Sequence, residues 1–248
     1  MKNILIILGI GITIFFAGCS KTQNADALAP NGSGQGGSLA RFTIAHNHLY
    51  VVDEQKLYTY SLANPEKPVL HNVTTVGINV ETIYPFKDML FIGSQDAMYV
   101  YSLEDPSKPD HQGTASHVRA CDPVVADGDV AYVTVRSGST CGGTLNALLV
   151  YDIKNINSPY EVSRRELNNP WGLGVKGNRL YVCDGNAGLN IFDITDQQSP
   201  VLIKKISGET FYDVIVTNNL LIAMIDGGTA LYEFGEGDAL VQVAKITN

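Results

Sequence analysis

A period of 41 residues constrains the fold of this chain more than any other feature, because repeats on this scale define whole architectures. A short apolar motif recurs, and its copies start at Leu49, Leu90, Ala131, Leu180 and Leu221, in steps of 41, 41, 49 and 41 residues. A second apolar motif keeps the same interval and starts at Leu57, Met98, Leu148, Leu189 and, more loosely, Leu231. Proline-containing turns follow the second motif in the first four units. The chain therefore consists of five similar units.

Each unit contains four short segments rich in Val, Ile, Tyr and Phe, which are typical of β-strands. In the fourth unit these segments are Gly172–Val175, Arg179–Cys183, Leu189–Asp193 and Val201–Ile206, separated by turn residues. No stretch after residue 38 shows sustained helical periodicity. We predict an all-β fold, a β-propeller of about five four-stranded antiparallel blades. The predicted repeats are 39–77, 78–119, 120–168, 169–208 and 209–248. A closed ring is expected, with an open or oligomer-completed array as the alternative.

The first 18 residues are predicted to be a lipoprotein signal peptide. Ile4 to Phe16 is an apolar run of thirteen residues, too short to cross a bilayer comfortably but typical of a signal-peptide core. It ends in Phe16-Ala17-Gly18-Cys19, which looks like a bacterial lipobox with Cys19 as the lipid attachment site. An ordinary secretory peptide is the alternative. Residues 19–38 are polar and rich in glycine, and we expect a flexible tether between the lipid and a propeller spanning 39–248.

The predicted anchor determines where the protein should act. A diacylated or triacylated cysteine is a stable membrane anchor, so we expect the membrane to be one partner. Ser20 rather than Asp follows Cys19, which by analogy with enterobacterial sorting favours the outer membrane of the bacterial envelope. Either face of that membrane, the cell surface included, fits this expectation.

Charge and cysteine content exclude several classes of protein. Lys and Arg number 17 against 25 Asp and Glu, for a net charge of −8, so a nucleic-acid partner is not expected. The four cysteines show no CxxC spacing for zinc. The third unit carries extra residues from Arg136 to Asn146, and an exported chain could bridge Cys121 to Cys141 across that insertion. Two unpaired thiols are the alternative. Cys183 ends an apolar strand and is expected to be a core residue.

One ring of positions differs in every unit and is the candidate binding face. In a propeller, the loop leading into the innermost strand and the loop between the second and third strands share a face, where binding usually occurs. In register, these loops present two aromatic residues among carboxylates, and the third-unit insertion adds an arginine. The predicted partner-binding residues are Glu81, Asp122, Arg136, Trp171, Tyr212 and Asp213. Aromatic platforms beside charged groups suit sugars or cations, although such side chains also cap strand ends.

Two sequence segments resemble a known family. Leu189-Asn-Ile-Phe-Asp-Ile-Thr-Asp and Leu148-Leu-Val-Tyr-Asp-Ile, each followed by a proline turn, resemble LVIVD repeats of bacterial propeller-like proteins. The stretch from Ala131 to Gly143 is similar to lipoproteins of that group from Bacteroidetes. The resemblance covers about residues 41–248, weakest in the fifth unit. It implies a propeller at a bacterial surface and no particular reaction.

Enzyme motifs are absent from the sequence: it contains no GxSxG, HExxH, Walker A or strand-following GxGxxG motif. His46 and His48 flank Asn47 and are interpreted as a turn rather than a metal site. We therefore predict a non-enzymatic protein, without metal or cofactor, that binds a protein or glycan on its loop face. One alternative is a carbohydrate-active enzyme using Glu81, Asp122 and Asp213, since glycosidases need paired carboxylates. The other is a purely structural envelope protein.

Overall fold

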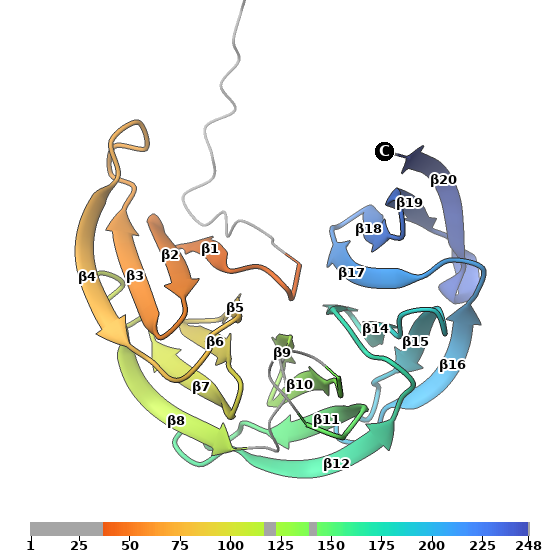
Figure 1. Cartoon of the computed structure of the whole chain (residues 1–248), viewed down its shortest axis with the longest axis horizontal. Coiled ribbons are helices and arrows are strands. Elements are labelled where there is room, and N and C mark those ends of the chain that lie inside the picture. The colour runs from red at the N-terminus through yellow and green to blue at the C-terminus, as the bar shows by residue number, and fades with distance from the viewer. Residues whose placement is uncertain (1–36, 117–122, 139–142, 248) are drawn as a thin grey trace, which may run out of the picture.

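The chain folds into five sheets of four antiparallel strands (Figure 1), as a computed structural model that describes residues 37–116, 123–138 and 143–247. Blade 1 contains β1 (Phe42–Ala45), β2 (His48–Asp53), β3 (Lys56–Ser61) and β4 (Val69–Thr75). Blade 2 contains β5 (Thr82–Phe86), β6 (Met89–Gly93), β7 (Ala97–Ser102) and β8 (Asp110–Ser116). Blade 3 contains β9 (Val124–Asp127), β10 (Val130–Val135), β11 (Ala147–Asp152) and β12 (Tyr160–Glu166). Blade 4 contains β13 (Leu173–Lys176), β14 (Arg179–Cys183), β15 (Leu189–Asp193) and β16 (Val201–Ile206). Blade 5 contains β17 (Phe211–Val216), β18 (Leu220–Ile225), β19 (Gly228–Phe234) and β20 (Leu240–Thr247).

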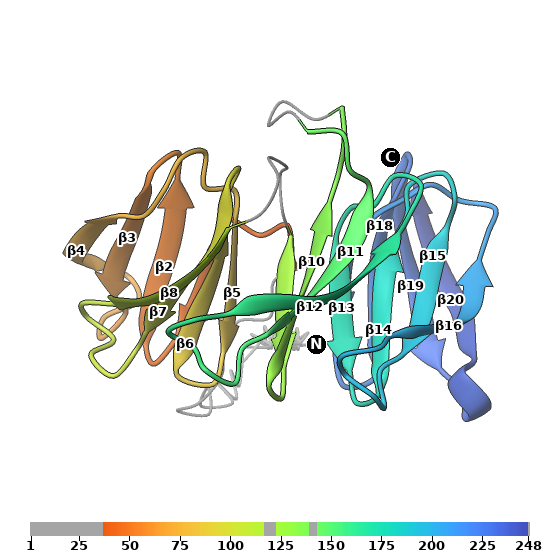
Figure 2. The same ribbon diagram turned by 90° about the horizontal axis from the view of Figure 1, so that it is seen from below.

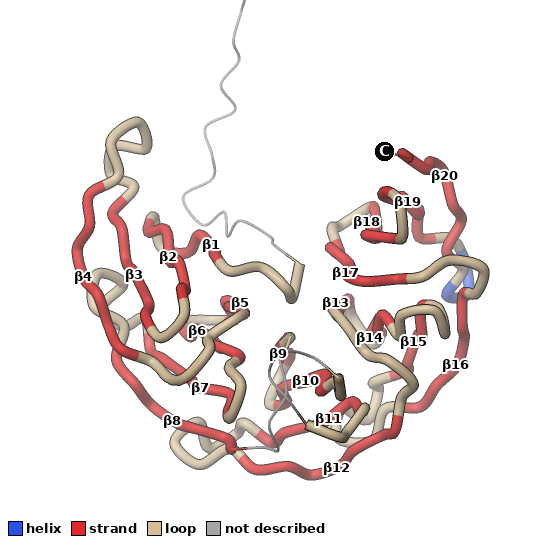
Figure 3. The backbone as a smooth tube through the Cα atoms, viewed as in Figure 1, coloured by secondary structure: helices blue, strands red, loops and turns tan. Residues whose placement is uncertain are grey.

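The five-bladed, all-β architecture predicted from the repeat is confirmed. Each blade uses four consecutive strands, so no strand is exchanged between units. Within the described residues, one 3₁₀ turn at Glu236–Asp238 is the only helical element (Figure 3). None of the described residues form a helix that is long and apolar enough to cross a membrane. The turn predicted at His46 and Asn47 is also present, because both residues adopt positive φ. The local sequence patterns therefore specify the elements well.

A bulge recurs between the third and fourth strands of every blade. The strand register shifts between Thr59 and Tyr60 in blade 1 and between Ile191 and Phe192 in blade 4, and the other three blades carry the same shift. A bulge increases the local twist and bends the strand. In this way each outer strand can follow the rim of the molecule, as the curved outer strands in Figure 1 show.

Adjacent blades stack face to face, and their contacts form the core. Four apolar clusters join blade 1 to 2, 2 to 3, 3 to 4 and 4 to 5. The predicted proline turns contribute to this stacking. The Tyr50 hydroxyl of blade 1 donates to the Pro106 carbonyl of blade 2 at 2.8 Å. In the same way, Tyr132 of blade 3 donates to the Gln197 carbonyl of blade 4 at 2.9 Å. Each blade therefore depends on its neighbours for burial.

Blades 1 and 5 do not stack on each other, and the molecule is an open arc (Figures 1 and 2). Consecutive inner strands touch from β1 through β5, β9 and β13 to β17, whereas no core cluster of the described residues joins blade 5 to blade 1. The expected closed ring is thus replaced by the open array that was its alternative. The repeat pattern determines the blades but not the angle between them.

The segment from Gly37 to Ala40 crosses the axis of the arc. The Ala40 carbonyl accepts a hydrogen bond from the Ile83 amide of blade 2 at 2.9 Å. The Ser38 hydroxyl accepts one from the Leu173 amide of blade 4 at 2.7 Å, and Ser38 is buried. Gly37 and Ser38, which the sequence analysis assigned to the tether, therefore belong to the folded domain.

Candidate functional site

The structure describes five of the predicted site residues. Glu81, Arg136, Trp171, Tyr212 and Asp213 all lie in its described part. The predicted lipid site, Cys19, and the predicted site residue Asp122 lie outside the described residues, as does the pair Cys121 and Cys141. The bridge and the anchor therefore stay predictions.

Three of the predicted residues form a stack. The guanidinium of Arg136 lies over the indole of Trp171, with its central carbon 3.5 Å from the ring centroid. Tyr212 meets the same indole edge to face, with ring centroids 5.0 Å apart. Both geometries are favourable, because the negative face of an aromatic ring attracts a cation or the edge of another ring. We call Glu81, Arg136, Trp171 and Tyr212 the Trp171 cluster.

Backbone contacts from blades 3, 4 and 5 fix the position of Trp171. Its amide donates to the Cys183 carbonyl at 2.8 Å, and its carbonyl accepts from the Thr134 hydroxyl at 2.5 Å. The next amide, that of Gly172, donates to the Tyr212 carbonyl at 2.9 Å. Trp171 is therefore held where three blades meet, which makes it a rigid platform.

Asp184 holds the loop that leads to Trp171. Its buried carboxylate accepts hydrogen bonds from the backbone amides of Asn168 and Asn169, at 2.9 and 2.8 Å. The Asn168 and Asn190 side chains also donate to it, at 3.0 and 3.2 Å. A buried carboxylate needs this many donors to offset its lost hydration. The sequence analysis counted Asp184 only among the turn residues that separate Arg179–Cys183 from Leu189–Asp193. The signal that could have found it is an aspartate directly after an apolar strand.

Glu81 and Arg136 provide opposite charges at the cluster. Burial lowers the pKa of Arg136, and the nearby Glu81 carboxylate opposes that shift by favouring the charged guanidinium. A pocket of about 140 Å³ opens beside these groups, lined by Leu39, Glu81, Thr82, Pro123, Arg136, Pro170 and Trp171. The indole Nε1 of Trp171 is buried, and no acceptor among the described residues bonds to it. The cluster thus combines aromatic surface, a compensated charge pair and an unused donor.

Asp213 follows Tyr212 in sequence but has a different role. Its carboxylate accepts the Ser38 hydroxyl at 3.3 Å and backbone amides of Ser38, Leu39 and Val214. Burial raises its pKa to about 6, although these hydrogen bonds act in the opposite direction. A Cβ added at Gly37 or Gly172 would come within 2.1 or 1.9 Å of its oxygens. Asp213 therefore anchors the segment before β1 and is not presented to a partner on an open face.

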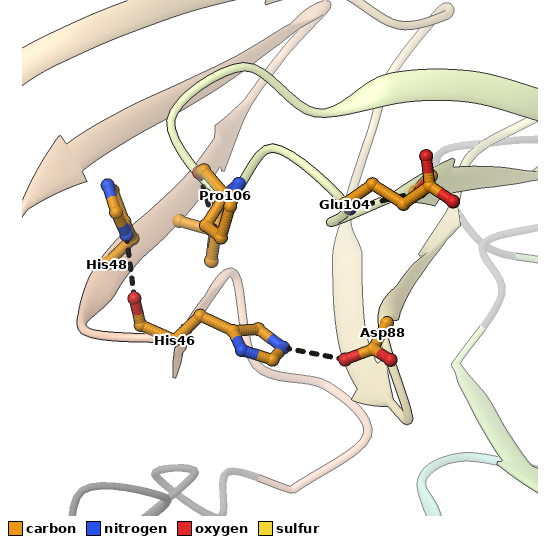
Figure 4. A network of polar contacts seen from close by, with 7 residues as sticks. His46, His48, Asp88, Glu104 and Pro106 are labelled. Carbon is orange, nitrogen blue, oxygen red and sulfur yellow. Dashed lines mark hydrogen bonds and ion pairs between the residues drawn. The ribbon is translucent and has the colours of Figure 1, made fainter.

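The remaining candidates from the sequence have structural roles. Cys183 is fully buried, and burial raises the pKa of its thiol well above the ordinary value. His46 pairs with Asp88 of blade 2 at 3.2 Å, whereas the His48 ring contacts the His46 carbonyl at 2.8 Å (Figure 4). The two rings do not converge, and the described residues contain no cluster of metal-ligating side chains.

Comparisons with known proteins identify the repeat and the fold. The LVIVD repeat family matches residues 169–207, which include all of blade 4. No curated protein matches the sequence significantly.

Solved structures match the fold at low sequence identity. A protein from Lactobacillus plantarum is 15% identical, with a TM-score of 0.68 over 81% of this chain and 68% of that one. The periplasmic gluconolactonase of Pseudomonas aeruginosa is 12% identical, with a TM-score of 0.63 over 82% and 68%. A computationally designed protein is 10% identical, with a TM-score of 0.58, and the match covers 83% of this chain but only 60% of that chain. At these identities the matches show a shared fold and do not transfer any activity to this chain. The chain is therefore a repeat β-propeller that carries an LVIVD repeat in its fourth blade.

Proposed function

We propose that this protein is a non-catalytic binding module of the bacterial envelope, anchored by a lipid on Cys19, which binds a protein partner through the Trp171 cluster. The stack of Arg136, Trp171 and Tyr212 carries the proposal. Trp, Tyr and Arg are the residues that dominate binding energy at protein interfaces. In this protein Arg136, Trp171 and Tyr212 form one rigid platform where blades 3, 4 and 5 meet.

The same geometry favours a protein over a glycan. A sugar ring stacks on an open aromatic face, and Arg136 already covers one face of Trp171 at 3.5 Å. Tyr212 meets the ring edge to face, which reduces the aromatic surface that a sugar could use. The pocket of about 140 Å³ has room for one side chain of a partner, close to the buried Trp171 Nε1.

The catalytic alternative has less support from the geometry. It needs two carboxylates facing a common substrate. Asp213, one of the three candidates, accepts hydrogen bonds from Ser38 and Leu39 instead. The gluconolactonase shares the fold with this chain at 12% identity, which does not transfer its activity.

The binding test uses the full chain as bait for envelope proteins of the cells that produce it. We expect at least one protein to be captured by the wild type and lost with Trp171→Ala and Arg136→Ala. Tyr160→Ala is the matched control, because Tyr160 is an exposed aromatic residue on the outer strand of blade 3. A captured set that does not change with Trp171→Ala would refute the proposal and favour a purely structural protein. Loss of glycan-array binding with the same variant would identify a glycan as the ligand instead.

The anchor is tested separately. We expect Cys19→Ala to move the protein from the membrane fraction to the soluble fraction and to abolish incorporation of labelled fatty acid. A wild-type protein that is found soluble and unlabelled would contradict the anchor without affecting the binding proposal. Protease treatment of intact cells then decides whether the propeller faces outward.

A further inference from the structure

The two ends of the arc expose positions that every other blade buries. Phe42 on β1 is 60% exposed, whereas the residues in register with it are at most 1% exposed; these are Ile83, Val124, Leu173 and Val214. In each later blade this position packs against the preceding blade. No blade of the described residues precedes blade 1. The sheet face of blade 1 that carries Phe42 therefore corresponds to a blade–blade interface, but no other blade of the described residues packs on it.

Blade 5 shows the complementary exposure. Met224 on β18 is 47% exposed, whereas its counterparts Val52, Thr134 and Cys183 are buried. In blades 1 and 4 this position packs against the following blade. No blade of the described residues follows blade 5, so none of them covers the face around Met224. Exposed apolar patches of this kind mark interaction sites.

Neighbouring positions on blade 1 show that the whole face is involved. Leu49, Val51 and Tyr60 are half-buried in blade 1. Their counterparts in blade 2 are Leu90, Ile92 and Tyr101, which are buried against blade 1. Register pairs place Phe42 beside Val51 and Leu49 beside Tyr60, all on one side of the sheet. The exposed surface is therefore a continuous apolar sheet face.

We propose that these two end faces bind each other between copies of this chain, with blade 1 of one copy stacked on blade 5 of the next. The interface would continue one that the chain already builds four times. In the cluster between blades 1 and 2, Val52 and Ile83 lie together, and in the cluster between blades 4 and 5, Cys183 and Val214 do. In each pair the first residue corresponds to Met224 and the second to Phe42. The contact is heterologous, because two different faces meet.

The shape of the arc explains why the partner is a second copy. Blades 1 and 5 of one chain lie apart in Figure 1, so the five blades fill only part of the circle. A second copy provides the face that blade 5 of the same chain does not bring to blade 1.

The main test measures the mass of the purified full chain by light scattering. We expect a species of two or more chains. Phe42→Glu and Met224→Glu should each weaken association about 100-fold or more, because a charge would be buried unpaired in an apolar contact. Both side chains are exposed in the single chain, so folding should be retained, as circular dichroism can verify. Val201→Glu is the matched control, since Val201 is 54% exposed on the outer strand of blade 4.

Mixing the two variants distinguishes this mode of association from others. The Phe42→Glu chain keeps an intact blade 5 face, and the Met224→Glu chain keeps an intact blade 1 face. An equimolar mixture should therefore form a one-to-one complex, although neither variant associates alone. A mixture that stays monomeric, or a wild type of single-chain mass at its highest soluble concentration, would overturn the proposal.

Crosslinking distinguishes a second copy from the two other ways in which these faces could be covered, by the same chain or by a different protein. A photoreactive p-benzoylphenylalanine in place of Phe42 should crosslink to β18 of another copy. Mixed ¹⁵N-labelled and unlabelled chains identify a link between copies by mass. A link confined to one chain would show that the arc closes on itself, and a link in cells to a different protein would show a foreign partner. Either result overturns the proposal.

Discussion

Blades 4 and 5 have the same four-stranded sheet but different surroundings. Blade 4 lies between two blades, and both of its faces are buried, whereas blade 5 has one face open. The LVIVD repeat family matches blade 4. At one matched position, blade 4 has Gly172 and blade 5 has Asp213, and the carboxylate of the second fills the space that a side chain on the first would need. The repeat thus specifies the sheet, and departures from it specify how blades fit together.

The largest expected contrast comes from one matched pair of core truncations. Ile191 is buried between blades 4 and 5. The strand register shows that its counterpart in blade 5 is Leu231, which the looser sequence match had aligned with Leu189, and Leu231 is half-buried on the open face. We expect Ile191→Ala to lower the free energy of unfolding by about 3 to 4 kcal/mol, because it leaves a cavity. Leu231→Ala should cost about 1 kcal/mol. Urea unfolding of dilute protein measures both, and equal costs would show that the open face is covered.

The pH dependence of stability should reveal Asp213, which has no counterpart carboxylate in blade 4. Its folded pKa of about 6 lies above the ordinary 3.8, so the folded state binds its proton more tightly than the unfolded state. This contribution is fully present below about pH 3.8 and is lost as pH rises through 6, a change of about 3 kcal/mol. The stability difference between wild type and Asp213→Asn, measured by urea unfolding from pH 4 to 7, should follow that curve. A flat difference, or one rising with pH, would contradict it.

The fit between Gly172 and Asp213 can be broken and restored. A Cβ at Gly172 would lie 1.9 Å from an Asp213 oxygen, so Gly172→Ala should destabilise the protein by about 2 kcal/mol through overpacking. Asp213→Gly should recover part of that loss, which a double-mutant cycle would show as a coupling energy of about 1 kcal/mol or more. Additive effects would mean that the two residues do not compete for space.

The smallest expected effects come from two ion pairs, one in blade 4 and one in blade 5. Arg179 and Asp193 lie 2.8 Å apart in blade 4, and Lys245 and Glu209 lie 2.5 Å apart in blade 5. Both pairs are partly exposed, so Arg179→Ala and Lys245→Ala should each cost less than about 1 kcal/mol. Thermal unfolding at low and high salt should show both losses shrinking with salt. A salt-independent loss above that value would indicate packing by the long side chain instead.

The strands were predictable from sequence because each depends on local pattern. The strands predicted at Arg179–Cys183, Leu189–Asp193 and Val201–Ile206 agree with β14, β15 and β16. Register also placed Arg136, Trp171 and Tyr212 on one face, and the structure brings them into contact. These features follow from a strand's alternation and from a repeat's constant length.

Other features depend on contacts distant in sequence and could not be predicted in this way. Gly37 and Ser38 have the composition of a linker, yet both are buried. Asp213, which is 175 residues from Ser38, accepts hydrogen bonds from the Ser38 hydroxyl and the Ser38 amide. The opening between blades 1 and 5 depends on the angle between neighbouring blades. The size and shape of the side chains at each blade contact determine that angle. The motif repeat contains neither kind of information.

The segment crossing the axis also determines how force would travel through the molecule. A pull on the N-terminus first loads the hydrogen bonds of Ser38 to Asp213 and Leu173, in blades 5 and 4, and only then β1. These contacts lie far along the chain, so blades 4 and 5 must release Ser38 before a pull at this end can separate β1 from its sheet. Tension applied at this end therefore reaches the last two blades of the sequence before it reaches the first.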